Sequence, residues 1–261
     1  MSGGDGASAP GRVAIRAIDA ASRSNASRWA QRLNLPLDDA GTEQPAVVLE
    51  VGGDGLSLRP SGGPRVRVAP GRILARRGGG RDLLLRAVGR VAAGASVVDA
   101  TAGLGGDAWR LAAHGLRVTM IERVPLVAAL LEDALERARS GSEGAEAKAA
   151  AAHLTLLEGD AAALLPRLRP APVVVVLDPM YPRTGKHAKP RKGMALFRAL
   201  VGEDADAAAL LAVARGVARS RVVVKRPRRA PPLDAPAAVP SGSVMGTTTR
   251  YDLYAPDGRR P

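Results

Sequence analysis

Between residues 82 and 254, the sequence alternates between short apolar runs typical of β-strands and longer segments with the apolar spacing of helices. The run Val173–Leu177 is unbroken, which is typical of a central strand buried on both faces. Strands separated by helices predict an α/β fold with a parallel, doubly wound sheet. Such sheets bind their ligands at the carboxyl ends of the strands. We therefore expect the functional residues directly after the strands.

The same pattern predicts the position of each element in this region. The expected strands are Ser96–Asp99, Arg117–Glu122, Leu154–Glu158, Val173–Leu177, Arg221–Lys225 and a final edge strand at Tyr251–Tyr254. The expected helices are Asp82–Val91, Asp107–His114, Leu126–Arg139, Glu143–Ala152, Ala161–Leu168 and Asp204–Ala218. A Pro-rich connection without a regular pattern precedes the last strand.

The residues before this region predict a second, smaller unit. Residues 1–12 are typical of a flexible tail, and residues 13–72 are expected to form a small N-terminal α/β module. Within this module, residues 46–59 contain two β-type runs around a Gly-Gly-Asp-Gly turn, which is a hairpin signal. Val66–Ala69 is a candidate third strand. The remaining residues, 73–261, are expected to form the main domain.

Composition excludes several classes of function. The chain contains no cysteine, which excludes disulfides, thiolate metal sites and a cysteine nucleophile. The three histidines, His114, His153 and His187, are too scattered to predict a metal site. The first residues lack the features of a secretory signal, and no apolar run is long enough to cross a bilayer. We therefore expect a cytoplasmic protein with no metal and no membrane association.

Positive charge is the main compositional bias. The formal net charge is +13 and the pI is near 11.2, which favour a polyanionic partner. An Arg-rich composition from a GC-rich genome explains the total charge equally well, so the clustering of the charges carries more weight. The candidate RNA contacts lie in three clusters: Arg76, Arg77 and Arg81; Lys186, Lys189, Arg191 and Lys192; and Lys225 and Arg226.

A Gly-rich motif follows the first strand of the predicted sheet. That strand ends at Asp99, and a loop with Gly103, Gly105 and Gly106 leads to Asp107 at the start of the next helix. Glycines in such a loop let the backbone approach a cofactor closely. The loop also matches the dinucleotide fingerprint G-x-G-x-x-G/A, so a nicotinamide-dependent oxidoreductase is one interpretation.

The charges of this loop favour a different cofactor. A dinucleotide brings an anionic pyrophosphate to the start of the helix, where Asp99 and Asp107 would repel it. S-adenosylmethionine has no phosphate, and its cationic sulfonium and ammonium suit an acidic loop. A second interpretation of Asp107 is structural, as the cap of a helix that begins at Ala108.

Two acidic residues after the following strands are further cofactor candidates. Glu122 closes one strand, where its carboxylate can accept hydrogen bonds from both ribose hydroxyls of either cofactor. Asp160 follows the strand Leu154–Glu158, where it can accept a hydrogen bond from an adenine amino group. For Asp160, an ordinary position in a surface loop is an equally good interpretation.

The motif Asp178-Pro179-Met180-Tyr181 directly follows the central apolar strand. It resembles the element of methyltransferases that act on exocyclic amino groups. The carboxylate of Asp178, together with the backbone of Pro179 and Met180, would accept the hydrogens of the amine and direct its lone pair toward a methyl group. Tyr181 would stack on the base. The alternative interpretation is a tight proline turn that closes the strand.

Five stretches together resemble the ribosomal RNA small subunit methyltransferase J family, which methylates N2 of a guanine near the 3′ end of 16S rRNA. They are VVDATAGLGGDAW (97–109), RVTMIERVPLVAALLEDAL (117–135), VVVVLDPMYP (173–182), VVVKRP (222–227) and RYDLYA (250–255).

The resemblance implies a Rossmann-like class I SAM-dependent methyltransferase fold, with S-adenosyl-L-methionine as cofactor and 16S rRNA or the 30S subunit as partner. It also implies cofactor contacts at Gly106, Asp107, Glu122, Arg123, Asp160, Ala161 and Asp178. A SAM-dependent methyltransferase acting on another RNA, a protein or a small-molecule amine is an alternative. Of these, a protein or small-molecule substrate leaves the basic clusters without a role.

Overall fold

The computed structural model describes residues 13–38, 45–76, 82–180, 206–233 and 238–258 of the 261-residue chain. Together they form two compact units, which divide between Arg67 and Val68. The division lies near the boundary expected after residue 72, and the expected tail lies outside the described residues. No helix in the described ranges is long and apolar enough to span a membrane.

The first unit contains a three-stranded sheet in the order β1-β2-β3. Strand β1 (Val13–Ala17) is parallel to β2 (Val47–Gly52), and β2 is antiparallel to β3 (Gly55–Pro60). Helix α1 (Arg23–Leu33) packs against β1 and β2, and the short 3-10 helix η1 (Ala20–Ser22) precedes it. The β2–β3 pair confirms the predicted hairpin.

Besides the β2–β3 hairpin, the sheet contains β1 and no strand at Val66–Ala69. The prediction of a strand at Val66–Ala69 was therefore wrong. In that segment, Val66 forms an isolated antiparallel bridge with Leu58. Pro64 and Pro70 flank the segment, and proline lacks the N–H group that a strand ladder requires. The prediction used the apolar pattern alone and did not take the two flanking prolines into account.

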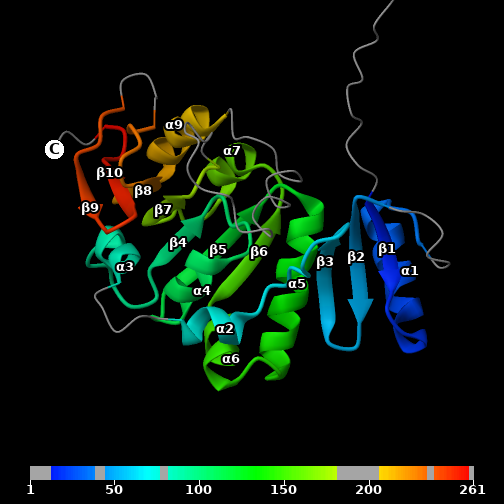
Figure 1. Cartoon of the computed structure of the whole chain (residues 1–261). Coiled ribbons are helices and arrows are strands. Elements are labelled where there is room, and N and C mark those ends of the chain that lie inside the picture. Colours follow the sequence, from blue (N-terminus) through cyan, green and yellow to red (C-terminus); the bar gives the residue numbers. More distant parts are fainter. Residues whose placement is uncertain (1–12, 39–44, 77–81, 181–205, 234–237, 259–261) are drawn as a thin grey trace, which may run out of the picture. The chain divides into compact units, whose positions relative to one another are not determined.

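The second unit is built on a seven-stranded sheet in the order β6-β5-β4-β7-β8-β10-β9 (Figure 1). Its strands are β4 (Ser96–Asp99), β5 (Arg117–Glu122), β6 (Leu154–Glu158), β7 (Val174–Leu177), β8 (Arg221–Pro227), β9 (Gly242–Met245) and β10 (Thr249–Tyr254). The first five strands in the spatial order are parallel, and β10 is antiparallel to both of its neighbours. This topology confirms the predicted α/β sheet and gathers the carboxyl ends of the parallel strands at one edge.

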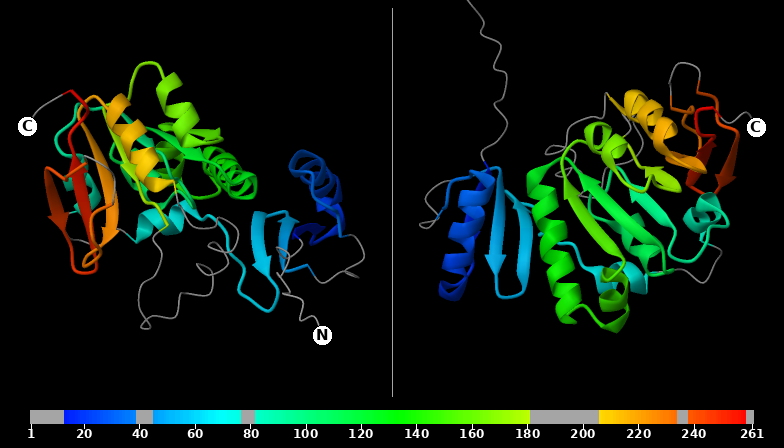
Figure 2. Two further views of the ribbon diagram at one scale, coloured as in Figure 1. Left: turned by 90° about the horizontal axis from the view of Figure 1, so that it is seen from above. Right: turned by 180° about the vertical axis from the view of Figure 1, so that it is seen from behind.

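Helices cover both faces of this sheet (Figures 1 and 2). The described helices of this unit are α2 (Pro70–Ala75), α3 (Leu83–Val88), α4 (Gly106–Ala112), α5 (Pro125–Ser140), α6 (Ala145–Ala151), α7 (Ala161–Leu164) with the 3-10 helix η2 (Leu165–Arg167), and α9 (Ala207–Val217). Helices α4 and α5 pack against β5 and β6. Helix α9 packs against β8 on the other face, together with α7 and η2.

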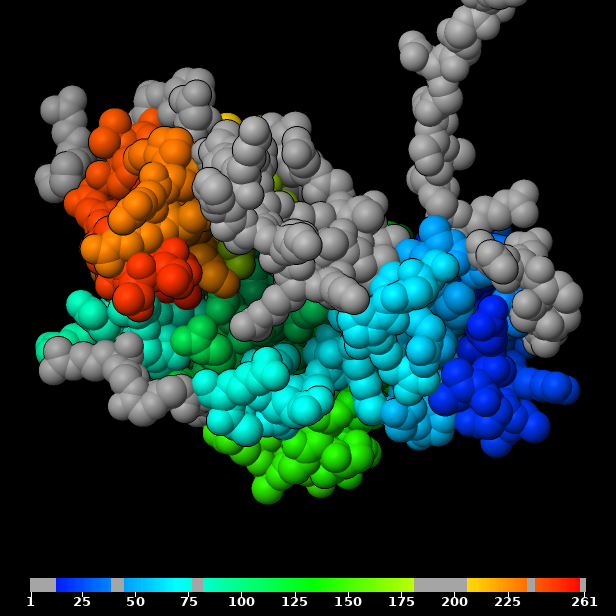
Figure 3. Space-filling model, in the orientation of Figure 1, coloured from blue at the N-terminus to red at the C-terminus, as the bar shows by residue number. Residues whose placement is uncertain are grey.

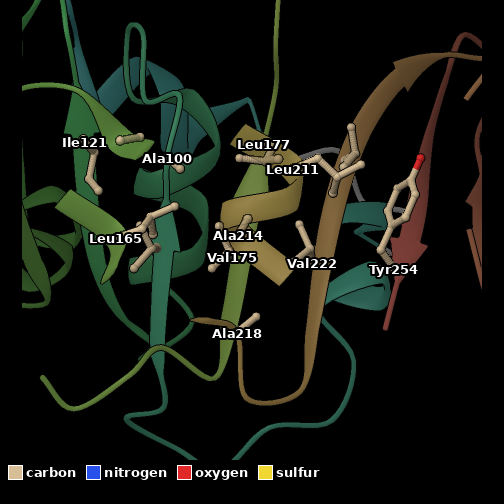
Figure 4. Close-up of a cluster of buried hydrophobic side chains, with 13 residues drawn as sticks. Ala100, Ile121, Leu165, Val175, Leu177, Leu211, Ala214, Ala218, Val222 and Tyr254 are labelled. Atoms are coloured by element: carbon tan, nitrogen blue, oxygen red, sulfur yellow. The ribbon is translucent and has the colours of Figure 1, made fainter. Parts of the chain in front are cut away.

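Side chains alternate along the central strands between two buried layers. Val98, Val175 and Val222 belong to a cluster that also contains Leu211 and Ala214 of α9 (Figure 4). The residues between them point to the opposite face, as the period of two in a strand requires, and they are equally buried. Burial on both faces explains the unbroken apolar sequence of β7 and fixes the strand ends that carry the site.

The last strand of the chain lies inside the sheet. Because β10 lies between β8 and β9, the prediction of an edge strand at Tyr251–Tyr254 was wrong. The edge strand β9 comes from a segment in which no regular pattern was expected, and its residues are exposed or half-buried. Such a strand has no buried face to mark it in the sequence. The β9–β10 hairpin packs against α3, as Figure 3 shows in red and teal.

One helix is shorter than expected for reasons visible at its two ends. Helix α3 begins after Asp82, whose carboxylate accepts hydrogen bonds from the backbone N–H groups of Leu84 and Leu85. It ends at Val88, because Gly89 follows with a φ of 78°, which does not continue a right-handed helix.

Candidate cofactor and catalytic site

The carboxyl ends of β4 and β7 bring two predicted site residues together, because these strands are neighbours in the sheet. Asp99 ends β4 and is 3% exposed, and Asp178 directly follows β7. The two loops are joined by a hydrogen bond in which the backbone N–H of Asp178 donates to Oγ1 of Thr101 at 2.6 Å. The Gly-rich loop and the Asp178 motif therefore belong to one site.

The structural reason for a glycine differs among the three positions of the loop. Gly103 and Gly105 have φ values of 54° and 75°, in the left-handed region that favours glycine. A Cβ atom at Gly105 would also lie 2.9 Å from Cδ2 of Leu131. A Cβ atom at Gly106 would meet nothing within 4 Å, and its φ is outside the left-handed region. Among the described residues, nothing therefore requires glycine at position 106, which leaves room there for a ligand.

Glu122, at the end of β5, holds the Gly-rich loop in place. Its Oε2 accepts a hydrogen bond from the N–H of Gly103 at 2.8 Å, and its Oε1 accepts one from the N–H of Val124 at 2.8 Å. Burial raises the pKa of Glu122, and these two N–H groups oppose that rise. The structure thus gives Glu122 a role in the loop, and its contact with ribose stays a prediction.

Asp107 does not cap a helix that begins at Ala108, so that interpretation was wrong. Helix α4 begins at Gly106, which places Asp107 inside its first turn. The carboxylate of Asp107 accepts instead from two cations, Nη1 of Arg110 at 3.2 Å and Nζ of Lys225 at 3.0 Å. Arg110 in turn forms an ion pair with Asp82, Nη2 to Oδ2, at 2.6 Å.

Lys225 lies in this site, and its contact with an RNA phosphate stays a prediction. Its ammonium donates to Oδ2 of Asp178 at 2.8 Å as well as to Asp107. Burial alone would lower the pKa of Lys225, but the two carboxylates, Asp178 and Asp107, raise it overall. The side chain is therefore a charged partner of the acidic residues that the sequence placed at the strand ends.

Arg226 is corrected as an RNA contact. Arg226 is 3% exposed, and its Nη2 donates to the carbonyl oxygen of Pro231 at 2.8 Å. Strand β8 pairs with β7 and β10 along its two edges, and Arg226 lies buried within it. The sequence had indicated Lys225 and Arg226 as a basic cluster of candidate RNA contacts.

Negative charge accumulates around Asp99. Burial raises the pKa of Asp99 to about 8, and the nearby carboxylates of Asp107 and Asp178 add to the rise. The N–H of Thr101, which donates to Oδ1 of Asp99 at 3.3 Å, acts in the opposite direction. Tyr251 of β10 faces the same group of charges, and burial raises its pKa to about 12.

The other predicted cofactor residues have structural contacts of their own. Arg123 forms an ion pair with Asp206, Nη1 to Oδ2, at 2.9 Å. Asp160 caps α7 by accepting from the N–H of Ala162 at 2.6 Å. Ala161, the first residue of α7, is buried. The structure therefore assigns Asp160 more than an ordinary loop position, and the cofactor contacts of these residues stay predictions.

Several predicted residues lie outside the described residues. They are Tyr181 of the catalytic motif and the basic residues Arg77, Arg81, Lys186, Lys189, Arg191 and Lys192. Arg76, at the end of α2, is described and exposed. Two contributors were missed, Thr101 and Arg110. Thr101 lies within the quoted Gly-rich motif, and a hydroxyl between a strand-end acid and the glycines was the available signal.

The arrangement suits a cationic ligand. Four carboxylates, those of Asp99, Asp107, Glu122 and Asp178, surround the loops after β4, β5 and β7, and Lys225 and Arg110 contact two of them. A buried acidic group favours a positively charged ligand and repels an anionic pyrophosphate. The electrostatics therefore count against the nicotinamide interpretation of the Gly-rich loop.

Comparison with known proteins covers nearly the whole chain. The family model described as "Putative SAM-dependent methyltransferase" matches residues 28–256. A curated relative from Pseudomonas paraeruginosa, named ribosomal RNA small subunit methyltransferase J, is 45% identical over 95% of this chain and 96% of its own. A relative of the same name from Stutzerimonas stutzeri is 45% identical over 88% of this chain and 90% of its own.

A solved structure supports the same conclusion. The SAM-dependent methyltransferase from Neisseria gonorrhoeae is 35% identical to this chain, with a TM-score of 0.74 over 95% of this chain and 97% of that one. These similarities confirm the predicted Rossmann-like fold and S-adenosylmethionine as the cofactor. The chain belongs to the ribosomal RNA small subunit methyltransferase J family of SAM-dependent methyltransferases.

Proposed function

We propose that this protein methylates the N2 amino group of a guanine in the 16S rRNA of the small ribosomal subunit. The observation that carries the proposal is the position of Asp178, at the end of the central strand β7, where Thr101 and Lys225 hold it. The relatives named ribosomal RNA small subunit methyltransferase J support the substrate. An enzyme with this substrate would act in the cytoplasm.

The residues around the Gly-rich loop fit the cofactor. S-adenosylmethionine, when bound, supplies a methyl group that its cationic sulfur has already activated. Asp99 and Asp107 offer negative charge to the positive groups, and Gly106 leaves space for close approach of the backbone. Each oxygen of Glu122 accepts one backbone N–H and has a second lone pair, so the carboxylate can still accept from ribose hydroxyls.

The remaining predicted cofactor contacts are retained in the proposal. They are Gly103, Gly105, Arg123, Asp160, Ala161 and Asp178. Oδ1 of Asp160 already caps α7, so Oδ2 is the atom that we assign to the adenine amino group. Arg123 follows the ribose-binding strand directly and would contact the cofactor from that side.

Orientation of the amine is the work of the Asp178 motif. The lone pair of an amino group attached to guanine is delocalised into the ring, so the group is a poor nucleophile. The carboxylate of Asp178 and the carbonyl groups of Pro179 and Met180 would accept its two hydrogens and turn the lone pair toward the methyl group. Tyr181 would stack on the base. Asp178 need not be a strong base, because the amine becomes acidic once methylated.

Basic residues outside the site would contact the RNA backbone. In this role we propose Arg76, Arg77, Arg81, Lys186, Lys189, Arg191 and Lys192. Helix α1 adds a basic surface, because it contains Arg23, Arg28 and Arg32 and no acidic residue. Arg32 lies over the ring of Trp29, 4.9 Å from its centroid. Exposed arginines beside an aromatic ring suit a nucleic acid.

The alternative functions have less support. A nicotinamide-dependent oxidoreductase would place a pyrophosphate beside Asp99 and Asp107 and would leave the Asp178 motif without a role. A methyltransferase for a protein or a small-molecule amine would use the site but not the basic surfaces. A methyltransferase for another RNA would use both, so the experiment must identify the product.

The experiment has two stages. Calorimetric titration with S-adenosylmethionine, with NAD in parallel, should give micromolar binding of the first and none of the second. Methyl transfer to 30S subunits from a strain without its own enzyme should then yield N2-methylguanine in digested 16S rRNA. Binding of NAD without binding of S-adenosylmethionine would show that the proposed cofactor is wrong. Methylation of another nucleotide or another RNA would show that the proposed substrate is wrong.

A further inference from the structure

We infer that Lys225 is a positioning residue that couples the cofactor loop to the carboxylate that orients the amine. The inference rests on the proposed function. The ammonium of Lys225 donates to Oδ2 of Asp107 at 3.0 Å and to Oδ2 of Asp178 at 2.8 Å. Asp107 directly follows the Gly-rich loop, and Asp178 follows β7. A single side chain thus joins the cofactor part of the site to the substrate part.

The sheet fixes the position of this ammonium. Lys225 lies within β8, which is hydrogen-bonded to β7 on one side and to β10 on the other, where its partner is Tyr251. Its side chain is only 28% exposed. The backbone on both sides is therefore rigid, and the two acidic residues are held at a defined point rather than by a mobile surface lysine.

The charged groups that face Lys225 come from every element around it. They are Asp99 at the end of β4, Asp107 and Arg110 on α4, Asp178 after β7 and Tyr251 on β10. The carboxylates of Asp99, Asp107 and Asp178 repel one another, and each raises the cost of a neighbouring negative charge. The cation between Asp107 and Asp178 reduces this repulsion and keeps both side chains in one geometry.

Lys225 should have opposite effects on binding and on turnover. Its positive charge repels a cationic cofactor, so it weakens cofactor binding. Its hydrogen bond holds the carboxylate of Asp178 in the position that orients the amine, so it increases the rate of methyl transfer. A lysine that only stabilised the fold would affect the two quantities in the same direction, because its loss would disorder the whole site.

The test compares Lys225→Met with Lys225→Arg and with Lys148→Met as the matched control. Lys148 is an exposed lysine on α6, away from the strand ends. We expect K225M to lower kcat by about 10- to 100-fold. The same variant should bind S-adenosylmethionine as tightly as the natural protein, or up to about tenfold more tightly. K225R should recover part of the loss of kcat.

The outcomes separate this inference from the proposed function. If the natural protein fails to bind S-adenosylmethionine, both are wrong. If it binds the cofactor but does not methylate 30S subunits, the substrate is wrong, and the affinity of K225M still tests the electrostatic part of the inference. Weaker cofactor binding by K225M, or a kcat within threefold of the natural enzyme or of K148M, would overturn the role of Lys225. A loss of thermal stability in parallel with the loss of kcat would assign it a structural role instead.

Discussion

Two buried acidic residues, one in each unit, differ in the ion pairs and hydrogen bonds that their surroundings provide. Glu50 of β2 is 5% exposed, and Asp99 of β4 is 3% exposed. Glu50 is neutralised by two arginines, because Nε of Arg59 lies 2.5 Å from Oε1 and Nε of Arg65 lies 2.8 Å from Oε2. Among the described residues, Asp99 has no ion pair, and only the N–H of Thr101 donates to it.

The difference separates a structural acid from a functional one. Burying a carboxylate is costly unless charge and hydrogen bonds compensate it. Glu50 receives that compensation from its own unit, including the hydroxyl of Ser57 at 3.4 Å. Asp99 does not, and its pKa of about 8 reflects the uncompensated burial. We infer that its compensating charge arrives with the cofactor, so acids of the site should matter for function and Glu50 for stability.

The largest effect should come from Asp178. Replacing Asp178 with Ala should lower kcat by roughly 10²–10⁴-fold, because the amine loses the acceptor that orients it. The melting temperature should change little, since Asp178 is exposed at a strand end. Kinetics on 30S subunits and a thermal melt measure the two quantities.

The matched control for this variant is Asp257→Ala. Asp257 is an exposed carboxylate that forms an ion pair with Arg215 at 2.8 Å, outside the site. This control should retain normal activity. Near-normal activity in D178A would remove the orientation mechanism, and a large loss of stability in D178A would erase the contrast with Glu50.

Glu50 should show the reverse behaviour. Replacing Glu50 with Ala leaves Arg59 and Arg65 without their shared partner and should cost about 1–3 kcal/mol in the free energy of unfolding, because both arginines are partly exposed. The affinity for S-adenosylmethionine should stay unchanged. Urea denaturation and calorimetry measure the two effects. Glu50→Gln, which keeps the shape and part of the hydrogen bonding, should lose less than the Ala variant.

The sequence located most of the sheet and the acidic residues because both depend on local patterns. The strands β4, β5 and β6 have the predicted bounds, since each is a short apolar run that ends at an acid. Asp99, Glu122 and Asp178 could be recognised as site residues because parallel strands place their carboxyl ends at one edge. Only strand order, which the sequence leaves open, decides that β4 and β7 are neighbours and that Thr101 reaches Asp178.

The residues that sequence reasoning misplaced depend on long-range pairing. Lys225 and Arg226 were predicted only as RNA contacts, because nothing nearby in sequence indicates that β10 pairs with β8. Pairing with β10 places Lys225 opposite Tyr251 and beside two acidic residues that are far away in sequence. The role of Glu122 in holding Gly103 was missed for the same reason.

Asp99 predicts a pH dependence of cofactor binding. In the free protein its pKa of about 8 keeps it protonated at lower pH, and a bound cation would favour the charged form and lower that pKa. Binding should therefore release a proton, and affinity should rise with pH up to about 8 and then level off. We expect a gain of about tenfold between pH 6 and 8, with Glu122, whose pKa is also raised, contributing in the same direction.

Calorimetry in buffers with different ionisation enthalpies measures the released proton directly. The Asp99→Asn variant should bind S-adenosylmethionine more weakly than the natural protein, and its affinity should lose most of its pH dependence. It should also release fewer protons on binding. The variant should also be more stable than the natural protein, by an amount that grows as pH rises from 3.8, where Asp99 ionises in the unfolded chain, to about 8, where it ionises in the folded state. If the affinity of D99N depends on pH as strongly as that of the natural protein, Asp99 does not interact with the positive charge of the cofactor.

The smallest effects should come from two adjacent glycines, and they repeat the contrast within the site itself. Gly105→Ala forces a Cβ atom to 2.9 Å from Leu131 at a φ of 75°, and it should cost roughly 1–2 kcal/mol of stability. Gly106→Ala meets no atom within 4 Å and no strained φ, so its stability should stay within about 0.5 kcal/mol of the natural protein. If the cofactor approaches the backbone at Gly106, G106A should nevertheless bind it several-fold more weakly. Equal affinity in G106A would place the cofactor elsewhere along the loop, and equal destabilisation of both variants would mean that position 106, like Glu50, serves the fold.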